Sequence, residues 1–292
     1  MEYIIQNRYL RVMISSIGAE LQSIRGCNGT EYLWQGDART WADRAPNIFP
    51  YVARLTEGKY KYREKEYKMD IHGFLPQTEL VACKIKDDRI SFRLSSNDNI
   101  RKSYPFEFTY LLHYKLEERK ICIIYEVRNE GEEKMYFGLG GHPGFCVPNE
   151  KGLAYTDYYL EFEKEANPRL IEMTDTCFVK GSESEFPLRD KKILDLRHDL
   201  YDDDALILRE MCRKVSLKST KGKKEVVVEF PNMDYLGIWH WPKVEVNYVC
   251  IEPWTSLPSR DGIIEDIEYQ KNLIGLSAGK TYVNRWSIEI KE

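Results

Sequence analysis

The chain has 292 residues, a formal net charge of −4 and an aromatic content of 13%. It carries no basic block and no apolar run near the roughly 20 residues that cross a bilayer, so nucleic acid and membranes are excluded as expected partners. Its seven cysteines are widely spaced without a C-x-x-C pair, so neither a disulfide framework nor a zinc knuckle is predicted. Because the N-terminus resembles no signal peptide, we expect a cytoplasmic protein.

Short apolar runs, separated by glycine, proline and polar residues, predict many β-strands in the first half of the chain. The Asn28-Gly29 pair is a strong turn signal, and residues 60–69 alternate tyrosine with charged residues as a hairpin does. Two prolines, Pro46 and Pro50, disfavour a helix in residues 41–59. The expected strands are residues 3–5, 10–14, 18–24, 31–36, 79–85, 90–94, 108–116 and 120–128.

The second half continues this pattern, except that the polar residues 163–204 are expected to be mostly solvated loops. Amphipathic helices are scarce, and no phosphate-binding, dinucleotide or nucleophile-elbow motif occurs. Many short strands without a dividing linker predict an all-β fold, a large antiparallel β-sandwich that forms one domain over residues 1–292. The further expected strands are residues 158–162, 215–217, 225–230, 236–241, 248–252 and 281–290.

Residues 138–145, with the sequence GLGGHPGF, place four glycines and one proline around His142. Glycine adopts backbone conformations barred to other residues and lets another segment approach closely. A histidine in such a loop is expected to be presented with little crowding, and its proton exchanges near neutral pH, which suits acid or base chemistry. The alternative is a glycine-rich turn with an incidental histidine.

Glu252 and His72 also occupy sequence positions that favour a functional role over a role in core packing. Glu252 ends an apolar run before Pro253, so the strand is predicted to stop there, and a carboxylate at the end of a buried strand is unfavourable unless it is paired or working. His72 precedes a glycine, which again predicts a presented side chain. His113 lies within a predicted strand and is expected to be structural, whereas His198, in a charged stretch, is expected to be solvated.

Arg54 and Asp204 each have two interpretations. Arg54, alone in an apolar stretch, either extends to solvent from a strand or directs its planar guanidinium at ligand oxygens. Asp204 directly precedes the apolar residues 205–208, so it is either solvated or faces a site from the edge of a strand. Two histidines and a glutamate can also ligate a metal, but these lie far apart in sequence without the close pairing of metal motifs, so no metal is predicted.

Four segments follow one another in the chain: NIFPYVARL at residues 47–55, HGF at 72–74, GHPGF at 141–145 and CIEPW at 250–254. In this order and spacing they resemble the aldose 1-epimerase (galactose mutarotase) family, and within it a bacterial LacX-like branch. The similarity spans essentially the whole chain. It implies the large antiparallel β-sandwich of that family, the supersandwich. One departure is Ala53, where the family often has glycine.

The resemblance implies an enzyme that interconverts the α- and β-anomers of a free hexose by opening and closing the sugar ring. It assigns Glu252 as the base that takes the proton of the anomeric hydroxyl and His142 as the acid that protonates the ring oxygen. His72 and Arg54 match positions that hold sugar oxygens, and Asp204 matches an acid that grips hydroxyls. A small sugar is the implied partner, no metal or organic cofactor is implied, and the protein is expected to be a monomer or homodimer.

Other functions stay open on the same fold. A hexose-6-phosphate 1-epimerase would need clustered arginines or lysines at the pocket mouth, and Arg54 has no obvious clustered partner in the sequence. A non-catalytic sugar-binding module would not need both an acid and a base, whereas this chain has a candidate for each. A glycoside hydrolase is disfavoured because its chemistry usually needs two carboxylates, and only Glu252 stands out. Trp239 or Trp254 could offer the sugar a stacking face.

Overall fold

The computed structural model describes residues 1–292 and consists largely of β-strands and their connections, which confirms the all-β prediction. Its one α-helix, α1 (Asp98–Ser103), is capped by the side chain of Asn97. The protein has no helix with the length and hydropathy that crossing a membrane requires. Four short 3-10 helices, η1 to η4, span Thr56–Gly58, Leu75–Gln77, Tyr155–Asp157 and His198–Tyr201.

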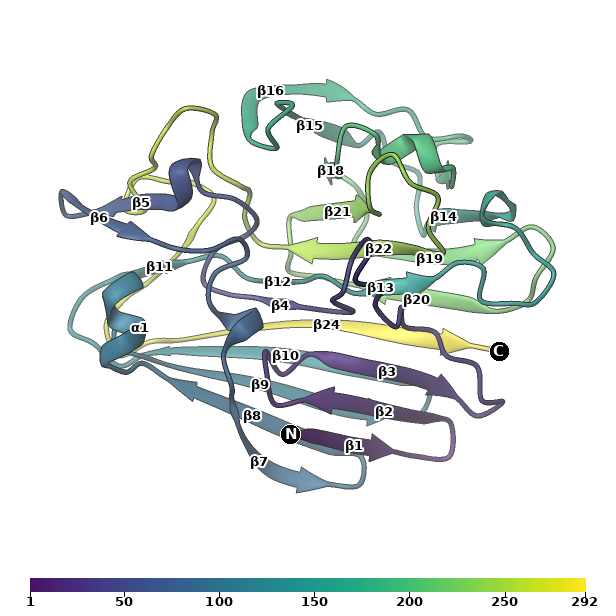
Figure 1. Ribbon diagram of the computed structural model, residues 1–292, viewed down its shortest axis with the longest axis horizontal. Helices are drawn as coiled ribbons and strands as arrows, with labels where there is room; N and C mark the ends of the chain where they lie inside the picture. The colour runs from purple at the N-terminus through teal and green to yellow at the C-terminus, as the bar shows by residue number, and fades with distance from the viewer.

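Two large antiparallel sheets form the body of the molecule (Figure 1). The nine-stranded sheet has the order β17-β14-β19-β20-β24-β10-β9-β8-β7. Its strands are β7 (Val81–Lys86), β8 (Arg89–Ser95), β9 (Phe108–Glu117), β10 (Lys120–Asn129), β14 (Tyr158–Phe162), β17 (Ile193–Asp195), β19 (Lys214–Ser219), β20 (Glu225–Glu229) and β24 (Thr281–Lys291).

The eight-stranded sheet has the order β16-β15-β18-β21-β22-β12-β4, and β13 also pairs with β22. Its strands are β4 (Asn47–Ile48), β12 (Gly140–Gly141), β13 (Gly144–Cys146), β15 (Arg169–Met173), β16 (Val179–Glu185), β18 (Leu206–Arg209), β21 (Tyr235–Trp239) and β22 (Tyr248–Trp254). Three small sheets complete the fold: β1 (Glu2–Gln6) with β2 (Leu10–Ser15) and β3 (Leu21–Gly26), β5 (Lys59–Tyr62) with β6 (Lys65–Lys68), and β11 (Met135–Phe137) with β23 (Ile274–Leu276).

Side chains from both large sheets meet in one main core. On β10 the side chains of Ile121, Ile123, Tyr125 and Val127 are fully buried in it, as their shared face predicts. On β22 the side chains alternate between two environments. Val249 and Ile251 join the main core, whereas Cys250 and Trp254 belong to two small clusters apart from it. By the same alternation Glu252 lies on the outer face of β22, away from the main core.

The strands differ from the prediction in two places. The polar residues 163–204 contain three short strands that the prediction does not include, β15, β16 and β17, although most of these residues lie in turns and loops as expected. β16 and β17 are edge strands, where one side of the strand remains free and charged residues are tolerated. β22 continues through Pro253 to Trp254 instead of stopping at Glu252. The φ angle of proline fits extended backbone, and pairing with both β21 and β12 holds the strand end in place.

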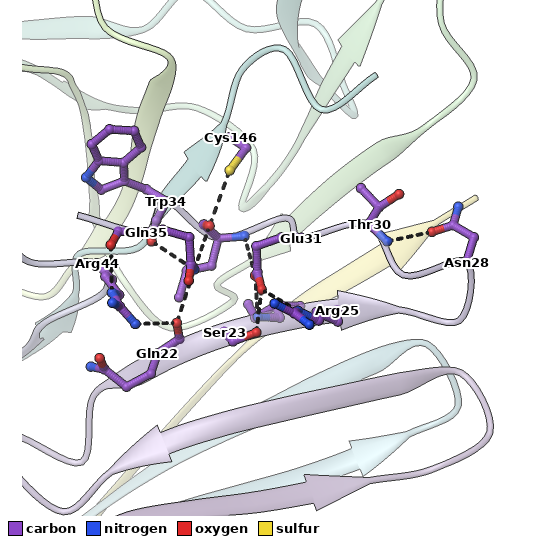
Figure 2. A network of polar contacts seen from close by, with 12 residues as sticks. Gln22, Ser23, Arg25, Asn28, Thr30, Glu31, Trp34, Gln35, Arg44 and Cys146 are labelled. Carbon is purple, nitrogen blue, oxygen red and sulfur yellow. Dashed lines mark hydrogen bonds and ion pairs between the residues drawn. The ribbon is translucent and has the colours of Figure 1, made fainter. Parts of the chain in front are cut away.

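The predicted strand at residues 31–36 is wrong, because this segment forms only isolated bridges. The Glu31 carboxylate instead accepts hydrogen bonds from the backbone N–H of Ile24 at 2.7 Å and from the hydroxyl of Ser23 (Figure 2). A side chain that bonds to a nearby backbone in this way offers the chain an alternative to a regular ladder.

A second part of the same network fixes the segment before β4. Arg44 donates to the carbonyl oxygen of Gln22 at 2.9 Å (Figure 2), and its own carbonyl accepts the N–H of Gly144 at 2.9 Å. The His142 N–H donates to the carbonyl of Pro46, also at 2.9 Å. The network therefore holds the turn that carries His142 against the segment that leads into β4.

The glycines of residues 138–145 permit close approach, as predicted, and none of them has a positive φ. A Cβ on Gly140 would lie 2.5 Å from the carbonyl oxygen of Pro253, and one on Gly144 would lie 2.7 Å from the ring of Trp41. β12 and β13 can therefore lie against β22 and its neighbours only because these positions lack side chains.

Candidate active site

A pocket of about 260 Å³ opens on the outer face of the eight-stranded sheet, where Glu252 lies. All five predicted site residues line it, although they come from five separate parts of the chain. Most of the other lining residues are apolar, and four of them are tryptophans: Trp41, Trp239, Trp241 and Trp254. A concave, largely apolar site of this size with a few converging polar groups suits one small ligand.

Glu252 and His142 face each other in this pocket, with 3.2 Å between Glu252 Oε2 and His142 Nε2. The Glu252 side chain is 1% exposed and that of His142 is 10% exposed. The contact lacks hydrogen-bond geometry, and neither Glu252 Oε2 nor His142 Nδ1 has a hydrogen-bond partner in the protein. Buried polar atoms are normally paired, so two unpaired ones that line a pocket mark groups available to a ligand.

The pKa shifts of the two groups indicate that the pair carries one proton in total. Burial raises the pKa of Glu252 well above its usual value, and the negative charge of Asp204 adds to this effect. Burial lowers the pKa of His142 well below its usual value, with His72 acting in the same direction. Both shifts favour the neutral forms, in which Glu252 holds the proton. The ion pair of carboxylate and imidazolium also holds one proton, so the two states differ only in its position.

Aromatic rings surround His142, so the expectation of an uncrowded, presented histidine is wrong. Its ring centroid lies 5.0 Å from that of Trp41, 5.6 Å from that of Trp239 and 5.3 Å from that of His72. The glycines of the loop admit these rings instead of leaving the histidine free. This packing fixes the plane of the imidazole and keeps Nε2 directed at Glu252.

A two-way contact with Ala53 holds His72. The Ala53 N–H donates to His72 Nδ1 at 3.3 Å, and the His72 N–H donates to the Ala53 carbonyl at 3.0 Å. Because Nδ1 accepts, the ring hydrogen is assigned to Nε2, which is left to donate to a ligand. Burial, together with Arg54, lowers the pKa of His72 to about 4, so it is a neutral donor at neutral pH.

The backbone at Ala53 explains the glycine that the resemblance leads one to expect there. Ala53 has a φ of 53°, in the left-handed region where glycine is least strained. Alanine nevertheless keeps the same contacts with His72, so this departure leaves Arg54 at the pocket.

Arg54 and Asp204 line the part of the pocket that continues into a second hollow. Arg54 is exposed and Asp204 is half-buried, so each keeps polar atoms within reach of a ligand. Cys177 lies with them; burial and the carboxylate of Asp204 raise the pKa of its thiol to about 11, which keeps it neutral. Asp204 has a φ of 80°, a strained conformation of the kind that gathers at functional sites.

Among the lining residues that the sequence did not assign to a site are Trp41, Asp43 and Cys177. None of them lies in a glycine-flanked or strand-end position, so no local signal marks them. Trp41 and Asp43 are brought to the pocket by the Arg44 network, and Cys177 by the turn between β15 and β16. Their placement depends on contacts between distant segments.

One group of side chains has the composition of a metal site. The possible ligand atoms of His142, Cys250 and Glu252 lie within 4.8 Å of one another, and all three residues are buried. From its place in an apolar strand, Cys250 is expected to pack as a small apolar residue. Its burial, beside Glu252, raises the pKa of the thiol well above the usual value, which keeps the thiol neutral. A cysteine binds zinc as the thiolate, and this environment opposes the ionisation of Cys250. That the site binds no metal stays a prediction.

His198 is half-buried and bonded within the protein, which corrects the expectation of a solvated side chain. Its ring stacks on Tyr155 with 4.0 Å between centroids, and its Nδ1 lies 3.1 Å from Nε2 of the fully buried His240. His240 Nδ1 lies 2.8 Å from the Trp241 carbonyl, which can only accept, so His198 donates to His240. His113 lies on the nine-stranded sheet, 2.7 Å from Ser91 Oγ and outside the pocket.

The space beside Glu252 depends on Gly237, its partner on β21. A Cβ on Gly237 would lie 2.9 Å from the Trp254 ring and 3.3 Å from Glu252 Cβ. We expect Gly237→Ala to lower the free energy of unfolding by about 1–3 kcal/mol through overpacking. Gly131→Ala is the matched control, because its Cβ would approach no atom closer than 3.4 Å and a change within about 0.5 kcal/mol is expected. Denaturant midpoints measure both; equal midpoints would contradict this packing.

Known proteins resemble this chain over its full extent. The family described as Aldose 1-epimerase matches residues 1–265. Protein LacX, encoded on a plasmid of Lactococcus lactis subsp. lactis, is 29% identical over 287 residues, which cover 94% of this chain and 96% of LacX.

Solved structures share the whole fold. A galactose mutarotase related enzyme from Lactobacillus acidophilus has 32% identity and a TM-score of 0.95, over 100% of this chain and 98% of its own. A galactose mutarotase-like protein from Lactobacillus casei ATCC 334 has 27% identity and a TM-score of 0.94, over 100% of both chains. The fold and the resemblance to LacX are thereby confirmed: this chain belongs to the aldose 1-epimerase family.

Proposed function

We propose that this protein is an aldose 1-epimerase that interconverts the α- and β-anomers of a free hexose. The observation that carries the proposal is the buried pair of Glu252 and His142, 3.2 Å apart, in a pocket that also contains His72, Arg54 and Asp204. A carboxylate and an imidazole that share one proton are the two groups that ring opening needs.

The reaction follows from this shared proton. With the pair as carboxylate and imidazolium, Glu252 takes the proton of the anomeric hydroxyl while the C1=O bond forms and the C1–O5 bond breaks. His142 gives its proton to O5, which leaves both groups neutral. Burial favours these neutral forms, so it stabilises the pair at the open-chain stage. After rotation about C1–C2 the steps reverse, and no net proton is consumed.

The other three residues have supporting roles. His72 Nε2 is a neutral donor, which suits an interaction with a sugar oxygen without an added charge. Arg54 donates through its guanidinium, and the half-buried Asp204 accepts from hydroxyls. The tryptophans around the pocket offer faces for the apolar C–H surface of a sugar ring.

The charges at the pocket favour a free sugar over a sugar phosphate. The second hollow contains Asp175, Asp202 and Asp203 besides Asp204, and its only cationic side chains are Arg54 and Lys243. A phosphate group would meet four carboxylates there and would lack a cluster of cations.

Polarimetry tests this choice. Freshly dissolved α-glucose and α-galactose should relax to equilibrium faster with enzyme than in buffer, and the kcat/KM values for glucose 6-phosphate and galactose 6-phosphate should be at least 100-fold lower. A preference for either phosphate would make the protein a sugar-phosphate epimerase instead.

The activity should depend on pH in a way that reflects the shared proton. At low pH the pair gains a second proton, and because burial lowers the pKa of His142, this occurs below the ordinary imidazole value of about 6.5. At high pH the pair loses its only proton, above the ordinary value for Glu252. We therefore expect the acid limb of kcat/KM to lie below pH 6.5, with His113→Gln giving the same profile. An acid limb at or above pH 6.5 would contradict the assigned shifts.

A further inference from the structure

A cluster of aromatic side chains, among them two histidines that the proposed chemistry does not use, lies behind one wall of the catalytic pocket. His240 is fully buried at its centre, and the residues on either side of it in the chain, Trp239 and Trp241, both line the pocket. A buried imidazole is unfavourable unless its nitrogens have hydrogen-bond partners. The other rings of the cluster are those of Tyr155, His198, Tyr201 and Tyr248.

The two histidines form a chain of hydrogen bonds with a single direction. His240 Nδ1 lies 2.8 Å from the Trp241 carbonyl oxygen, which can only accept, so the ring hydrogen of His240 is on Nδ1. His240 Nε2 therefore accepts from His198 Nδ1 at 3.1 Å. Burial lowers the pKa of His240 to about 4, so the ring is neutral at neutral pH. Both nitrogens of His240 are satisfied, and one of them is committed to the main chain of the pocket wall.

That main chain needs support because it lies beyond the end of a strand. β21 and its pairing with β22 end at Trp239, two residues before Trp241. The Trp241 N–H donates to the hydroxyl oxygen of Tyr248 at 3.1 Å, and its carbonyl accepts from His240. Two side chains therefore hold the backbone where the ladder no longer does. The rings of Trp239 and Trp241, with 6.2 Å between their centroids, form one surface, the indole wall.

The indole wall packs against His142. The Trp239 ring meets the His142 ring edge-to-face, with 5.6 Å between centroids and 86° between planes, and it meets the Trp41 ring at 5.6 Å and 85°. Trp41 in turn lies 5.0 Å from His142 and 5.4 Å from Tyr248. His142 Nδ1 has no hydrogen-bond partner in the protein. Because no hydrogen bond on that nitrogen orients the imidazole, the neighbouring rings set its plane.

We propose that His240 is a positioning residue for the reaction: through the Trp241 carbonyl it fixes the indole wall that sets the plane of His142. The inference rests on the proposed function, in which His142 gives its proton to the ring oxygen. His240 does not line the pocket and so does not touch the sugar. Loss of its hydrogen bond should therefore impair the alignment of the proton donor in the transition state more than the binding of the sugar.

Two substitutions separate the hydrogen bond of His240 from its bulk. His240→Asn keeps a side-chain N–H as many bonds from Cβ as Nδ1 and can still donate to the Trp241 carbonyl, whereas His240→Leu has no donor. In polarimetry with glucose and galactose, His240→Leu should lower kcat by at least about 10-fold and His240→Asn by less than about 3-fold. In both variants KM should change less than kcat does in His240→Leu. Equal losses of kcat in the two variants, or a rise in KM with kcat unchanged, would overturn the inference.

Tyr248→Phe tests the same support with a smaller change, and keeps the inference testable if His240→Leu does not fold. It removes only the oxygen that accepts the Trp241 N–H, and it leaves the ring that packs on Trp41. It should lower kcat by at least about 5-fold. Tyr155→Phe is the matched control in the same cluster, because the Tyr155 hydroxyl has no hydrogen-bond partner in the protein. The control should keep kcat within about 2-fold of the wild type, and equal kcat values in the two phenylalanine variants would contradict the proposed support.

NMR of protein labelled with 15N in its histidines gives a measurement that does not depend on activity. Long-range correlations between ring hydrogens and nitrogens should place the hydrogen of His240 on Nδ1 at neutral pH, and its signals are those absent from His240→Asn. A hydrogen on Nε2 would reverse the chain of hydrogen bonds and overturn the inference. If the wild type exchanges the anomers of neither glucose nor galactose, the proposed function fails and His240 has no reaction to support. An active wild type with an equally active His240→Leu removes the inference alone.

Discussion

Replacing Glu252 with glutamine is expected to lower kcat for mutarotation by about 10²–10⁴-fold, the range typical of a lost general base. The amide has nearly the shape of the carboxylate but cannot take the proton of the anomeric hydroxyl. Because Glu252 is 1% exposed and its pKa is raised by burial, the neutral amide should not disturb the fold. KM should change little, since the contacts proposed for His72, Arg54 and Asp204 with the sugar are not altered. Polarimetry with glucose or galactose measures both constants.

The matched control is Glu245→Gln, which makes the same chemical change on an exposed residue outside the pocket lining. It should leave kcat within 2-fold of the wild type. Activity that survives in Glu252→Gln at more than about a tenth of the wild-type value would remove Glu252 as the base, even though the epimerase activity itself would stand.

The second large effect concerns His142. We expect His142→Gln to lower kcat by about 10²–10⁴-fold, because the ring oxygen would lose its proton donor. Glu252 and His142 act on the same event, so their effects should not multiply. The double variant His142→Gln with Glu252→Gln should be less than about 10-fold slower than the slower single variant, as is found for groups that act as a unit. Single-turnover or polarimetric rates of all four forms complete the cycle.

His113→Gln provides the control, since His113 lies on the nine-stranded sheet and bonds to Ser91 outside the pocket. Multiplicative losses in the double variant would mean that the two residues act independently. The shared proton, on which the proposed chemistry depends, would then be wrong.

Much of the site was predictable because its residues interrupt local patterns. Glu252 is a carboxylate at the end of an apolar run, and His142 is a histidine among glycines; both line the pocket. The fold class followed from the strand pattern, which β10 shows with four alternate side chains fully buried. The resemblance to a family then linked residues that are up to about 200 positions apart, which no local pattern can do. The extent of the single domain over residues 1–292 stays a prediction.

What could not be predicted depends on long-range packing. The sequence suggests an open loop for His142, yet rings from Trp41, Trp239 and His72 enclose it. His198 lies in a charged stretch, but a fully buried histidine 42 positions later bonds to it. In both cases the deciding neighbour comes from another sheet or segment. Burial, and with it the pKa shift of each group, is a property of the assembled fold.

The measurement that tests the central claim most directly is saturation transfer by NMR between the anomeric protons of galactose or glucose at chemical equilibrium. It detects catalysis without any net reaction, and line broadening in the same spectra reports binding. We predict that the transfer rate rises in proportion to the concentration of wild-type enzyme. With Glu252→Gln, the rate should be no higher than in buffer alone. Saturable broadening without transfer in the wild type would show a sugar-binding module, and would contradict the claim that the Glu252–His142 pair opens the ring.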